Sequence, residues 1–450
     1  MSLDGSGYSG LVLEKLSAAG VKIGDTITIK HDDKEYSGIL MPRAQIGSDP
    51  DHIVVKLATG YNFGIRLTSQ SKVQLTKRGT ASKRPASKEI PEQTKGHPAV
   101  SILSTGGTIA SKVDYRTGAV NPALTAQDLY DTVPELKDHA NVTAKVLMSV
   151  FSEDIRPSDW TKIARAVATE IKQGTDGVII AHGTDTLGFT SAALSFALQH
   201  LPVPVVLVGS QRSSDRPSSD AAMNLILATD FVGHVDAAEV MLVMHGETDD
   251  SFVYAHRGTR VRKSHTSRRD AFQSINTYPI FKIDSSSITE MNPPLLRRDP
   301  NRTLRLKPKF EEKVAIVKTY PGFGHDILDH LVDHQYRGIV IEGTGLGHAP
   351  KSLQASVAHA VDAGIVVAMT SQCISGRVDM DVYRTGVELQ ELGIVACEDM
   401  LTETAFVKLS WLLANMKGTD KVKTALSRPY VGEIEMRSEM AEYSTTAEEI

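Results

Sequence analysis

From Pro98 onward, the sequence alternates short strand-like runs with segments of helical periodicity, and this alternation limits the possible folds more than any other feature. The strand-like runs cover residues 100–103, 178–181, 205–208 and 240–244. Such alternation is typical of βαβ units, in which helices cover both faces of a parallel sheet. We therefore predict an α/β fold with a buried parallel sheet.

Two helices are predicted between these runs. In the first, apolar side chains follow 3.6-residue spacing at Trp160, Ile163, Ala164, Val167, Ala168 and Ile171. Ser158 is the expected N-cap of this helix, and Gly174 is the expected stop. The second helix is predicted over residues 220–231.

A second, smaller α/β lobe is predicted after a connection. Residues 278–312 are rich in Pro and Arg and only weakly periodic, which favours a connection between lobes. Strand-like runs then resume at 314–317, 339–341 and 365–368, with a final helix near 402–416.

The region before Pro98 has a different texture. Short alternating runs at 21–23, 26–29 and 53–57, separated by turn-forming residues, predict a small, strongly bent β-barrel. Residues 77–96 hold six Lys or Arg against two Glu and almost nothing to bury, which is typical of a linker. Either a solvated tether or an RNA-contacting arm fits this segment. The end of the chain, residues 432–450, holds six Glu against one Arg and fits a mobile tail or a segment that docks on a partner.

These patterns divide the chain into six parts. The predicted parts are a small β-barrel (1–76), a basic linker (77–97), an N-terminal α/β lobe (98–290), an inter-lobe connection (291–312), a smaller C-terminal α/β lobe (313–427) and an acidic tail (428–450).

Composition excludes several classes of protein. Hydrophobic residues make up 41% and charged residues 23% of the 450 residues, as in ordinary globular proteins. The formal net charge of -5 offers no global field for nucleic acid. Only Cys373 and Cys397 occur, and they form no CxxC pair, so neither a disulfide framework nor a zinc cage is expected. The start, MSLDGSGYSG, lacks signal-peptide features, and no apolar stretch approaches 18 residues. We expect a cytoplasmic protein that makes no membrane contact.

Three polar segments could carry chemistry. STGGTIA at 104–110 and HGTDT at 182–186 each follow a predicted strand directly, where the loops of open α/β sheets gather ligands. RGTRVRKSHTSRRD at 257–270 holds six Lys or Arg, Lys263 among them, against one Asp. Together, hydroxyls, a carboxylate and a lysine supply the parts of a nucleophilic hydrolase, because a threonine hydroxyl needs a base or a cation to become reactive.

Each segment taken alone has a second interpretation. The TGGT loop could be a plain turn or a phosphate cradle. His182 has no second histidine at ligand spacing, so a structural role is favoured over a metal-binding one. A basic run such as 257–270 is more often a solvated surface than a site.

The combination of motifs resembles a known family. ILSTGGTIAS at 102–111 with AHGTDT at 181–186 resembles the paired signature of the bacterial-type L-asparaginases. GSQRSSDRPSSDAAMNL at 209–225 is similar to the next strand–loop–helix segment of that family, and GTGLGHA at 343–349 to the Gly-rich turn of its C-terminal lobe. The resemblance covers residues 98–418. It implies a two-lobed asparaginase-type fold with parallel sheets that forms at least a dimer.

The resemblance also implies catalytic roles for four residues. Thr108 matches the primary nucleophile of the family, and Thr184, Asp185 and Lys263 match its second threonine, aspartate and lysine. Thr108 would attack the side-chain amide carbon of the substrate to form an acyl-enzyme. The other three would form a polar relay, with Asp185 also pairing with the α-ammonium group of the substrate.

Five further residues are matched to binding and activation. Ser152 and Glu153 align with residues that hold the α-carboxylate and α-amino groups of the substrate. Backbone N–H groups of the loops at Gly107 and Gly183 are expected to stabilise the oxyanion. Tyr115 is the nearest match to the mobile-loop tyrosine of the family. We expect residues 111–121, which are polar, to become ordered only when a partner is engaged.

The N-terminal extension points to one branch of this family. The barrel, the basic linker, the run TGGTIASKVDYRTGAV and the segment KSHTSRRDAFQS resemble the D subunit of the archaeal glutamyl-tRNA(Gln) amidotransferases. This resemblance implies that the chain takes ammonia from glutamine (or asparagine) and supplies it to an E subunit, which uses ATP and Mg²⁺ to convert Glu-tRNA(Gln) to Gln-tRNA(Gln). It further implies a heterotetramer of two D and two E subunits, a homodimer of D within it, and neither a cofactor nor a metal in this chain.

Two other functions are weighed against this one. A free-standing asparaginase or glutaminase with an accessory domain would share the active site and would differ only in its partner; the N-terminal extension is the sequence feature that separates the two. A non-catalytic nucleotide-binding or scaffolding subunit would use the Gly-rich turns. The sequence argues against the latter, because residues 343–347 lack GxGxxG spacing and no GxxxxGK[ST] motif occurs.

Overall fold

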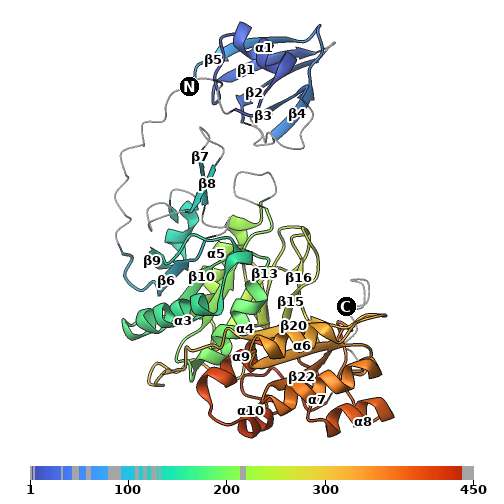
Figure 1. The fold of residues 1–450 in the computed structure, drawn as a ribbon. Coiled ribbons are helices and arrows are strands. Elements are labelled where there is room, and N and C mark those ends of the chain that lie inside the picture. Colours follow the sequence, from blue (N-terminus) through green and yellow to red (C-terminus); the bar gives the residue numbers. More distant parts are fainter. Residues whose placement is uncertain are drawn as a thin grey trace.

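The computed structural model describes residues 3, 6–31, 34–42, 50–56, 62–79, 93–106, 111–114, 119–122, 129–130, 133–212 and 219–437. Three of the predicted site residues, Thr108, Gly107 and Tyr115, lie outside the described residues. Figure 1 shows an N-terminal β domain in blue and two α/β lobes in green to red.

The N-terminal domain is an antiparallel sheet with one helix. Its five strands are arranged in the order β4-β3-β2-β1-β5. Alternating burial along β1 and β3 places Ile27, Ile29, Ile53 and Val55 in a common core. The helix α1, which the sequence pattern did not predict, adds Val12 and Leu16 to this core. The elements are α1 (Gly10–Ala18), β1 (Thr26–His31), β2 (Lys34–Leu40), β3 (His52–Lys56), β4 (Asn62–Arg66) and β5 (Lys72–Lys77).

The N-terminal lobe is built on an eight-stranded sheet in the order β18-β17-β14-β13-β12-β10-β6-β9. Five neighbouring strands of this sheet are parallel, as predicted: β13, β12, β10, β6 and β9. The strands β14, β17 and β18 extend the sheet in antiparallel fashion. Parallel strands with buried faces explain the continuous apolar runs in the sequence. The helix α5 covers one face of the sheet, while α3 and α4 cover the other.

This lobe and the connection that follows it contain many short elements. In chain order they are β6 (Ala99–Ser104), β7 (Ser111–Asp114), β8 (Ala119–Pro122), η1 (Pro134–Asp138), β9 (Asn141–Val146), η2 (Ser152–Asp154), α3 (Pro157–Lys172), β10 (Gly177–Ala181), α4 (Leu187–Ala197), β11 (Leu198–Gln199), β12 (Val205–Val208), α5 (Ala221–His234), β13 (Val240–His245), β14 (Val253–Arg257), β15 (Val261–Lys263), β16 (Phe272–Ser274), β17 (Phe281–Ile283), β18 (Ile288–Glu290) and β19 (Arg305–Leu306).

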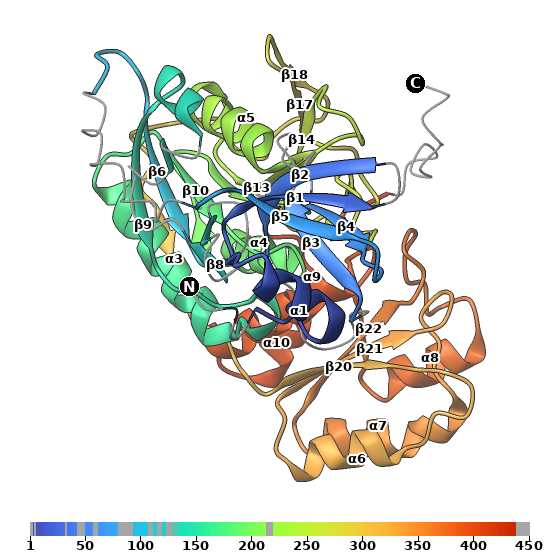
Figure 2. The same ribbon diagram turned by 90° about the horizontal axis from the view of Figure 1, so that it is seen from above.

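The C-terminal lobe has a four-stranded parallel sheet, β20-β21-β22-β23. Figure 2 shows this lobe, in orange and red, beside the N-terminal lobe. One hydrophobic core is shared by the two lobes: it joins α4 of the N-terminal lobe to α9 and to the sheet of the C-terminal lobe. In this core, the rings of Phe196 and Trp411 are stacked at a centroid separation of 5.6 Å. The elements are β20 (Val314–Lys318), α6 (Asp326–Asp333), β21 (Gly338–Gly343), η3 (Lys351–Leu353), α7 (Gln354–Asp362), β22 (Val366–Ser371), α8 (Arg384–Glu391), β23 (Val395–Ala396), α9 (Thr402–Asn415) and α10 (Thr419–Leu426).

Three local predictions were wrong. Ser158 is not the N-cap of α3: the cap is Arg156, and Pro157 fills the first helical position, where its missing N–H costs nothing. The helix near residues 402–416 is not the final one, because Gly418 (φ 93°) breaks the chain direction and α10 follows. Residues 278–312 are not only a connection, since β17 and β18 belong to the large sheet. Strands of three residues are too short to show a period of two in the sequence.

Among the described residues, no helix is both long enough and apolar enough to cross a membrane.

Candidate active site

The candidate site forms where two neighbouring parallel strands end. Gly177–Ala181 (β10) pairs with β6 so that Ala181 lies opposite Ser104. Beyond this pair, the Thr105 N–H donates to the Ala181 carbonyl oxygen at 3.0 Å, which holds the start of the STGGT loop against the start of the HGTDT loop. The two loops singled out in the sequence are therefore adjacent.

Close packing explains two glycines of these loops. Gly106 has φ 113°, which favours glycine, and a Cβ there would collide with the Val150 carbonyl oxygen. A Cβ on Gly183 would lie 2.8 Å from the Cβ atom of Ser152. Ser152 is itself buried, and its carbonyl oxygen accepts a hydrogen bond of 2.6 Å from the Thr186 hydroxyl. The predicted substrate-binding residues Ser152 and Gly183 thus lie side by side.

Three predicted catalytic residues meet at the end of β10. Lys263, the last residue of β15, donates to the Thr184 hydroxyl at 2.9 Å and to the Asp185 carboxylate at 2.7 Å. The Lys263 side chain is 16% exposed, whereas that of Asp185 is 65% exposed. A lysine that is shielded from water beside a hydroxyl stabilises the deprotonated form of that hydroxyl. The exposed face of Asp185 leaves carboxylate surface available for a cationic group of a ligand.

Of the remaining predicted residues, only Glu153 is among those that the structure describes. Glu153 lies in η2 with an exposed side chain. Thr108, Gly107 and Tyr115 fall outside the described residues.

His182 has a structural environment. Its ring is buried, with Nδ1 bonded to the Gly183 carbonyl oxygen at 2.7 Å and Nε2 to the Thr190 hydroxyl at 3.0 Å. The Trp160 indole N–H donates to the same hydroxyl at 3.1 Å. Burial lowers the pKa of His182 to about 4, outweighing the hydrogen bond to Gly183, so the ring is neutral near pH 7.

The basic run at 257–270 is a solvated surface only in part: residues 264–268 are exposed, but each of its six basic side chains has a carboxylate partner. Arg257 and Arg260 are buried in pairs with Glu239 and Asp399, at 3.1 Å and 2.8 Å. The other four pairs are Arg262–Glu403, Lys263–Asp185, Arg268–Asp270 and Arg269–Asp250. The run therefore joins elements that are far apart in sequence, including the two lobes.

Sequence reasoning missed a polar chain beside the site. Asn224 donates to Asp220 and contacts His245 Nδ1 at 2.6 Å, and His245 Nε2 contacts Asp250 at 3.1 Å. Arg269 pairs with Asp250 and also donates to the Thr248 carbonyl oxygen. Asp220 and Asn224 lie in the segment 209–225 and Arg269 lies in the basic run, but no local pattern connects them to His245 and Asp250, which come from β13 and the loop after it. Their contacts fix the Arg-rich loop that follows Lys263.

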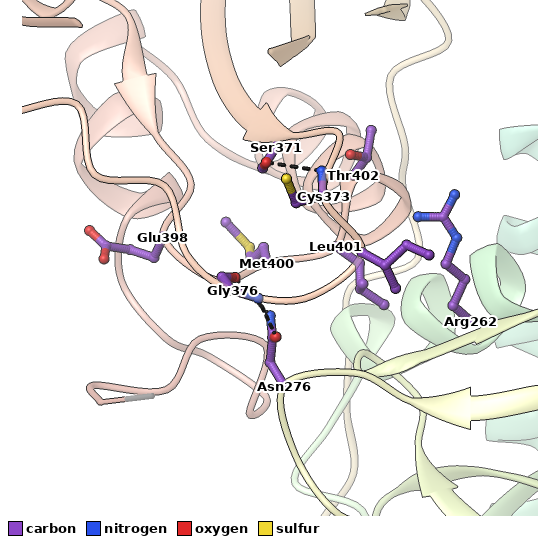
Figure 3. A pocket seen from close by; sticks show the side chains of 10 residues that line it. Arg262, Asn276, Ser371, Cys373, Gly376, Glu398, Met400, Leu401 and Thr402 are labelled. Carbon is purple, nitrogen blue, oxygen red and sulfur yellow. Dashed lines mark hydrogen bonds between the residues drawn. The ribbon is translucent and has the colours of Figure 1, made fainter. Parts of the chain in front are cut away.

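A narrow inter-lobe cavity of about 10 Å³ is lined in part by Arg262, the residue before Lys263. Figure 3 shows Arg262 and Asn276 of the N-terminal lobe facing Ser371, Cys373 and Gly376 of the C-terminal lobe. Asn276 and Gly376 are hydrogen-bonded at 2.8 Å, and a buried carbonyl of Asp399 accepts from the same asparagine. The cavity has room for about one water molecule, so it forms part of the lobe interface.

Three family models match this chain. The model described as Asparaginase, N-terminal covers residues 99–295, and the Glutaminase/Asparaginase C-terminal domain covers 313–426. The GatD N-terminal domain covers residues 21–76.

Solved structures and curated relatives agree with these models. The L-asparaginase of Thermococcus kodakarensis is 32% identical with a TM-score of 0.67, and the match covers 75% of this chain and 99% of that one. L-asparaginase I of Vibrio cholerae is 27% identical with a TM-score of 0.67, over 76% of this chain and 100% of that one. The glutamyl-tRNA(Gln) amidotransferase D subunit of Pyrococcus furiosus is 50% identical over 427 residues, which are 94% of this chain and 97% of the relative. The corresponding D subunit of T. kodakarensis is 48% identical over 425 residues, which are 94% and 96% of the two chains.

The fold and the arrangement of Thr184, Asp185 and Lys263 define an asparaginase-type enzyme. The chain also has an N-terminal domain that matches the GatD model, and it is 50% identical to an amidotransferase D subunit along almost its whole length. It therefore belongs to the D-subunit family of the glutamyl-tRNA(Gln) amidotransferases.

Proposed function

We propose that this chain is the ammonia-producing subunit of a tRNA-dependent amidotransferase. It hydrolyses glutamine, or asparagine, and passes the ammonia to an E subunit that converts Glu-tRNA(Gln) to Gln-tRNA(Gln). The observation that carries the proposal is the contact of Lys263 with both Thr184 and Asp185 at the edge where the STGGT loop begins. A polar cluster of this kind, on a chain related throughout to the amidotransferase D subunits, supports hydrolysis of an amide that serves a partner.

In the proposed mechanism, Thr108 provides the nucleophile. Its hydroxyl oxygen attacks the side-chain amide carbon, and its proton passes to the leaving NH₂ group, which departs as ammonia. Water then cleaves the acyl ester to release glutamate or aspartate and restore the hydroxyl. Backbone N–H groups at Gly107 and Gly183 would stabilise the oxyanion, with roughly 2.7–4 kcal/mol from each donor.

Thr184, Lys263 and Asp185 have the complementary role of moving protons and holding the substrate. Lys263 lowers the cost of removing the proton from Thr184, because its ammonium group lies 2.9 Å from that hydroxyl. Asp185 is exposed and can pair with the α-ammonium group of the substrate. Ser152 and Glu153 complete the binding of the α-carboxylate and α-amino groups.

The partner supplies the second half of the reaction. We propose a heterotetramer of two D and two E subunits, in which the D subunits form a homodimer and the E subunits use ATP and Mg²⁺. Glu-tRNA(Gln) is bound through the complex, and the reaction takes place in the cytoplasm. Tyr115 and the surrounding residues 111–121 would complete the site when partner and tRNA are engaged.

The second candidate is a free-standing asparaginase or glutaminase. It is favoured by the similarity to two L-asparaginases, each matched over 99–100% of its length. The N-terminal domain at residues 21–76 favours the first candidate.

The two candidates differ in how activity depends on a partner. A subunit that feeds ammonia to an acceptor would waste glutamine if it were fully active alone. We therefore expect weak glutaminase activity for the isolated chain and a large increase when the E subunit and Glu-tRNA(Gln) are added. The rate of ammonia release, measured with and without these partners, checks this. Full activity without a partner would favour the free-standing enzyme.

A further inference from the structure

A second cavity, of about 530 Å³, lies at the far end of α4 from the candidate site. The helix begins at Leu187, directly after the HGTDT loop, and its end at Ala197 leads into the cavity wall. Eleven helical residues span roughly 16 Å at about 1.5 Å per residue, so the cavity is separate from the cluster around Lys263.

Most of the cavity wall is apolar. It is formed by residues from β11, the start of β13 and the inter-lobe connection, namely Leu198, Leu201, Ala238, Val240, Leu295 and Leu296. Leu295 is 46% exposed, which keeps apolar surface accessible at the cavity. The volume falls within the range of about 300–1,000 Å³ that is usual for small-molecule sites.

One wall of the same cavity carries two cations. Arg305 and Lys307 line it, and neither has a carboxylate partner in the described part of the chain. Partial burial lowers the pKa of Lys307, and the nearby charge of Arg305 lowers it further. Lys307 does lie over the Trp411 ring, 5.4 Å from its centroid, but this contact adds no negative charge.

Glu239, the carboxylate among the lining residues, is already neutralised. It accepts hydrogen bonds from the buried Arg257 Nε at 3.1 Å and from the Leu295 N–H at 2.9 Å. The cavity therefore combines an apolar body with an excess of positive charge. An uncompensated pair of like charges at an apolar wall is stabilised by an anion whose remainder is apolar.

We propose that this cavity is a binding site for a small amphipathic anion, a molecule with an apolar body and one carboxylate, sulfonate or phosphate group. Its apolar part would contact the leucine-lined wall, and its anionic group would pair with Arg305 and Lys307. The inference does not depend on the proposed amidotransferase function, because no residue of the candidate active site contributes to the cavity.

The test uses the full chain and 8-anilinonaphthalene-1-sulfonate, an aromatic anion whose fluorescence rises in apolar surroundings. We expect saturable binding, and a Kd that is about tenfold weaker in the double variant Arg305→Gln, Lys307→Gln. The matched control is Lys309→Gln, Lys417→Gln, which removes the same charge from two exposed side chains outside the lining and should leave the Kd within about twofold. Equal Kd values in the two double variants would overturn the proposal.

Two further measurements test the proposal even if the double variant does not fold. Arg305 is exposed, so Arg305→Gln alone should fold normally and should weaken binding even if loss of the Lys307–Trp411 contact unfolds the double variant. Octanoate should displace the probe from the unmodified chain, whereas inorganic phosphate at the same ionic strength should not. Displacement by both would show a simple anion site and contradict the requirement for an apolar body.

Discussion

Two lysine–carboxylate pairs in this molecule have almost the same length but opposite surroundings. Lys263–Asp185 spans 2.7 Å, with exposed fractions of 16% and 65% for the two side chains. Lys408–Glu433 spans 2.6 Å, and both side chains are fully buried. The first pair also touches the Thr184 hydroxyl, whereas the second is closed by the backbone: Lys408 donates to two carbonyl oxygens, and Glu433 accepts from two backbone N–H groups.

The comparison shows that the chemical role of an ion pair depends on which other groups its two side chains contact. Burial lowers the pKa of Lys408, although Glu433 partly offsets this effect. With its polar atoms engaged in this way, the pair can only hold the segment after α10 against α9. The pair at Lys263 is open on one side and adjoins a hydroxyl. We therefore expect changes at Lys263 to affect catalysis and changes at Lys408 to affect stability.

The largest effect is expected at the proposed nucleophile, Thr108. Thr108→Ala and Thr108→Val should each abolish glutamine hydrolysis, because neither side chain can form the acyl-enzyme. Ammonia release is the measurement, and an unchanged thermal unfolding curve is the control for folding. Normal turnover in either variant would remove Thr108 from this role.

A large but smaller loss is expected at Lys263 itself. Lys263→Ala should lower kcat by about 100-fold or more, the scale of a group that assists proton transfer. Lys263→Arg should restore little, because a planar guanidinium cannot replace a point charge between two oxygens.

The matched control for Lys263 is Lys162→Ala. Lys162 also pairs with a carboxylate, Asp159, at 2.8 Å, but its side chain is 68% exposed on α3. Its loss should change kcat by less than about twofold. Equal effects on kcat at Lys162 and Lys263 would contradict a catalytic role for the Lys263–Asp185 pair.

The closed pair should respond in stability instead. Lys408→Met leaves Glu433 charged and buried, and the free energy of unfolding should fall by about 3–5 kcal/mol. Adding Glu433→Gln should recover part of this loss, because the uncompensated charge is removed. Urea unfolding of both variants measures the effect, while kcat at low temperature should stay within about twofold. If Lys408→Met were as stable as the unmodified chain, the Lys408–Glu433 pair would contribute nothing to the free energy of unfolding.

The smallest effect concerns a buried group that has no charged partner. The pKa of His182 is lowered to about 4 from 6.5, so between these values the unfolded chain binds a proton that the folded chain does not. Stability should therefore be fully present above pH 6.5 and should decrease as pH falls toward 4, by at most about 1.4 kcal/mol per pH unit.

The variant His182→Asn should be less stable at pH 7 but should show a shallower pH dependence in this window. His256, whose pKa burial lowers to about 3, contributes to the slope that remains. An identical slope in His182→Asn would contradict the neutral, buried state of this ring.

Much of the fold could be predicted because burial leaves a direct trace in the sequence. The runs at 178–181 and 205–208 became β10 and β12 almost unchanged, since parallel strands buried on both faces are apolar throughout. The antiparallel extension by β17 and β18 left no such trace, because three-residue strands carry too few positions to form a pattern.

Only part of the candidate site could be predicted from the sequence. Thr184 and Asp185 follow a strand directly, so their place at the sheet edge was foreseeable from the sequence. The contact of Lys263 with them spans 79 and 78 positions and came only from the family resemblance. Pairs such as Arg260–Asp399, 139 positions apart, depend on how the lobes pack and were not predictable from any local pattern.

The central claim is that this chain supplies ammonia and that a different subunit consumes it. The most direct test is amidation of Glu-tRNA(Gln) by a complex of the E subunit with the Thr108→Ala variant. With glutamine as the nitrogen donor, we predict no Gln-tRNA(Gln). With free ammonium, we predict a rate close to that of the unmodified complex, because the substitution removes only the ammonia source. Failure of ammonium to restore amidation in a correctly assembled complex would contradict this division of roles.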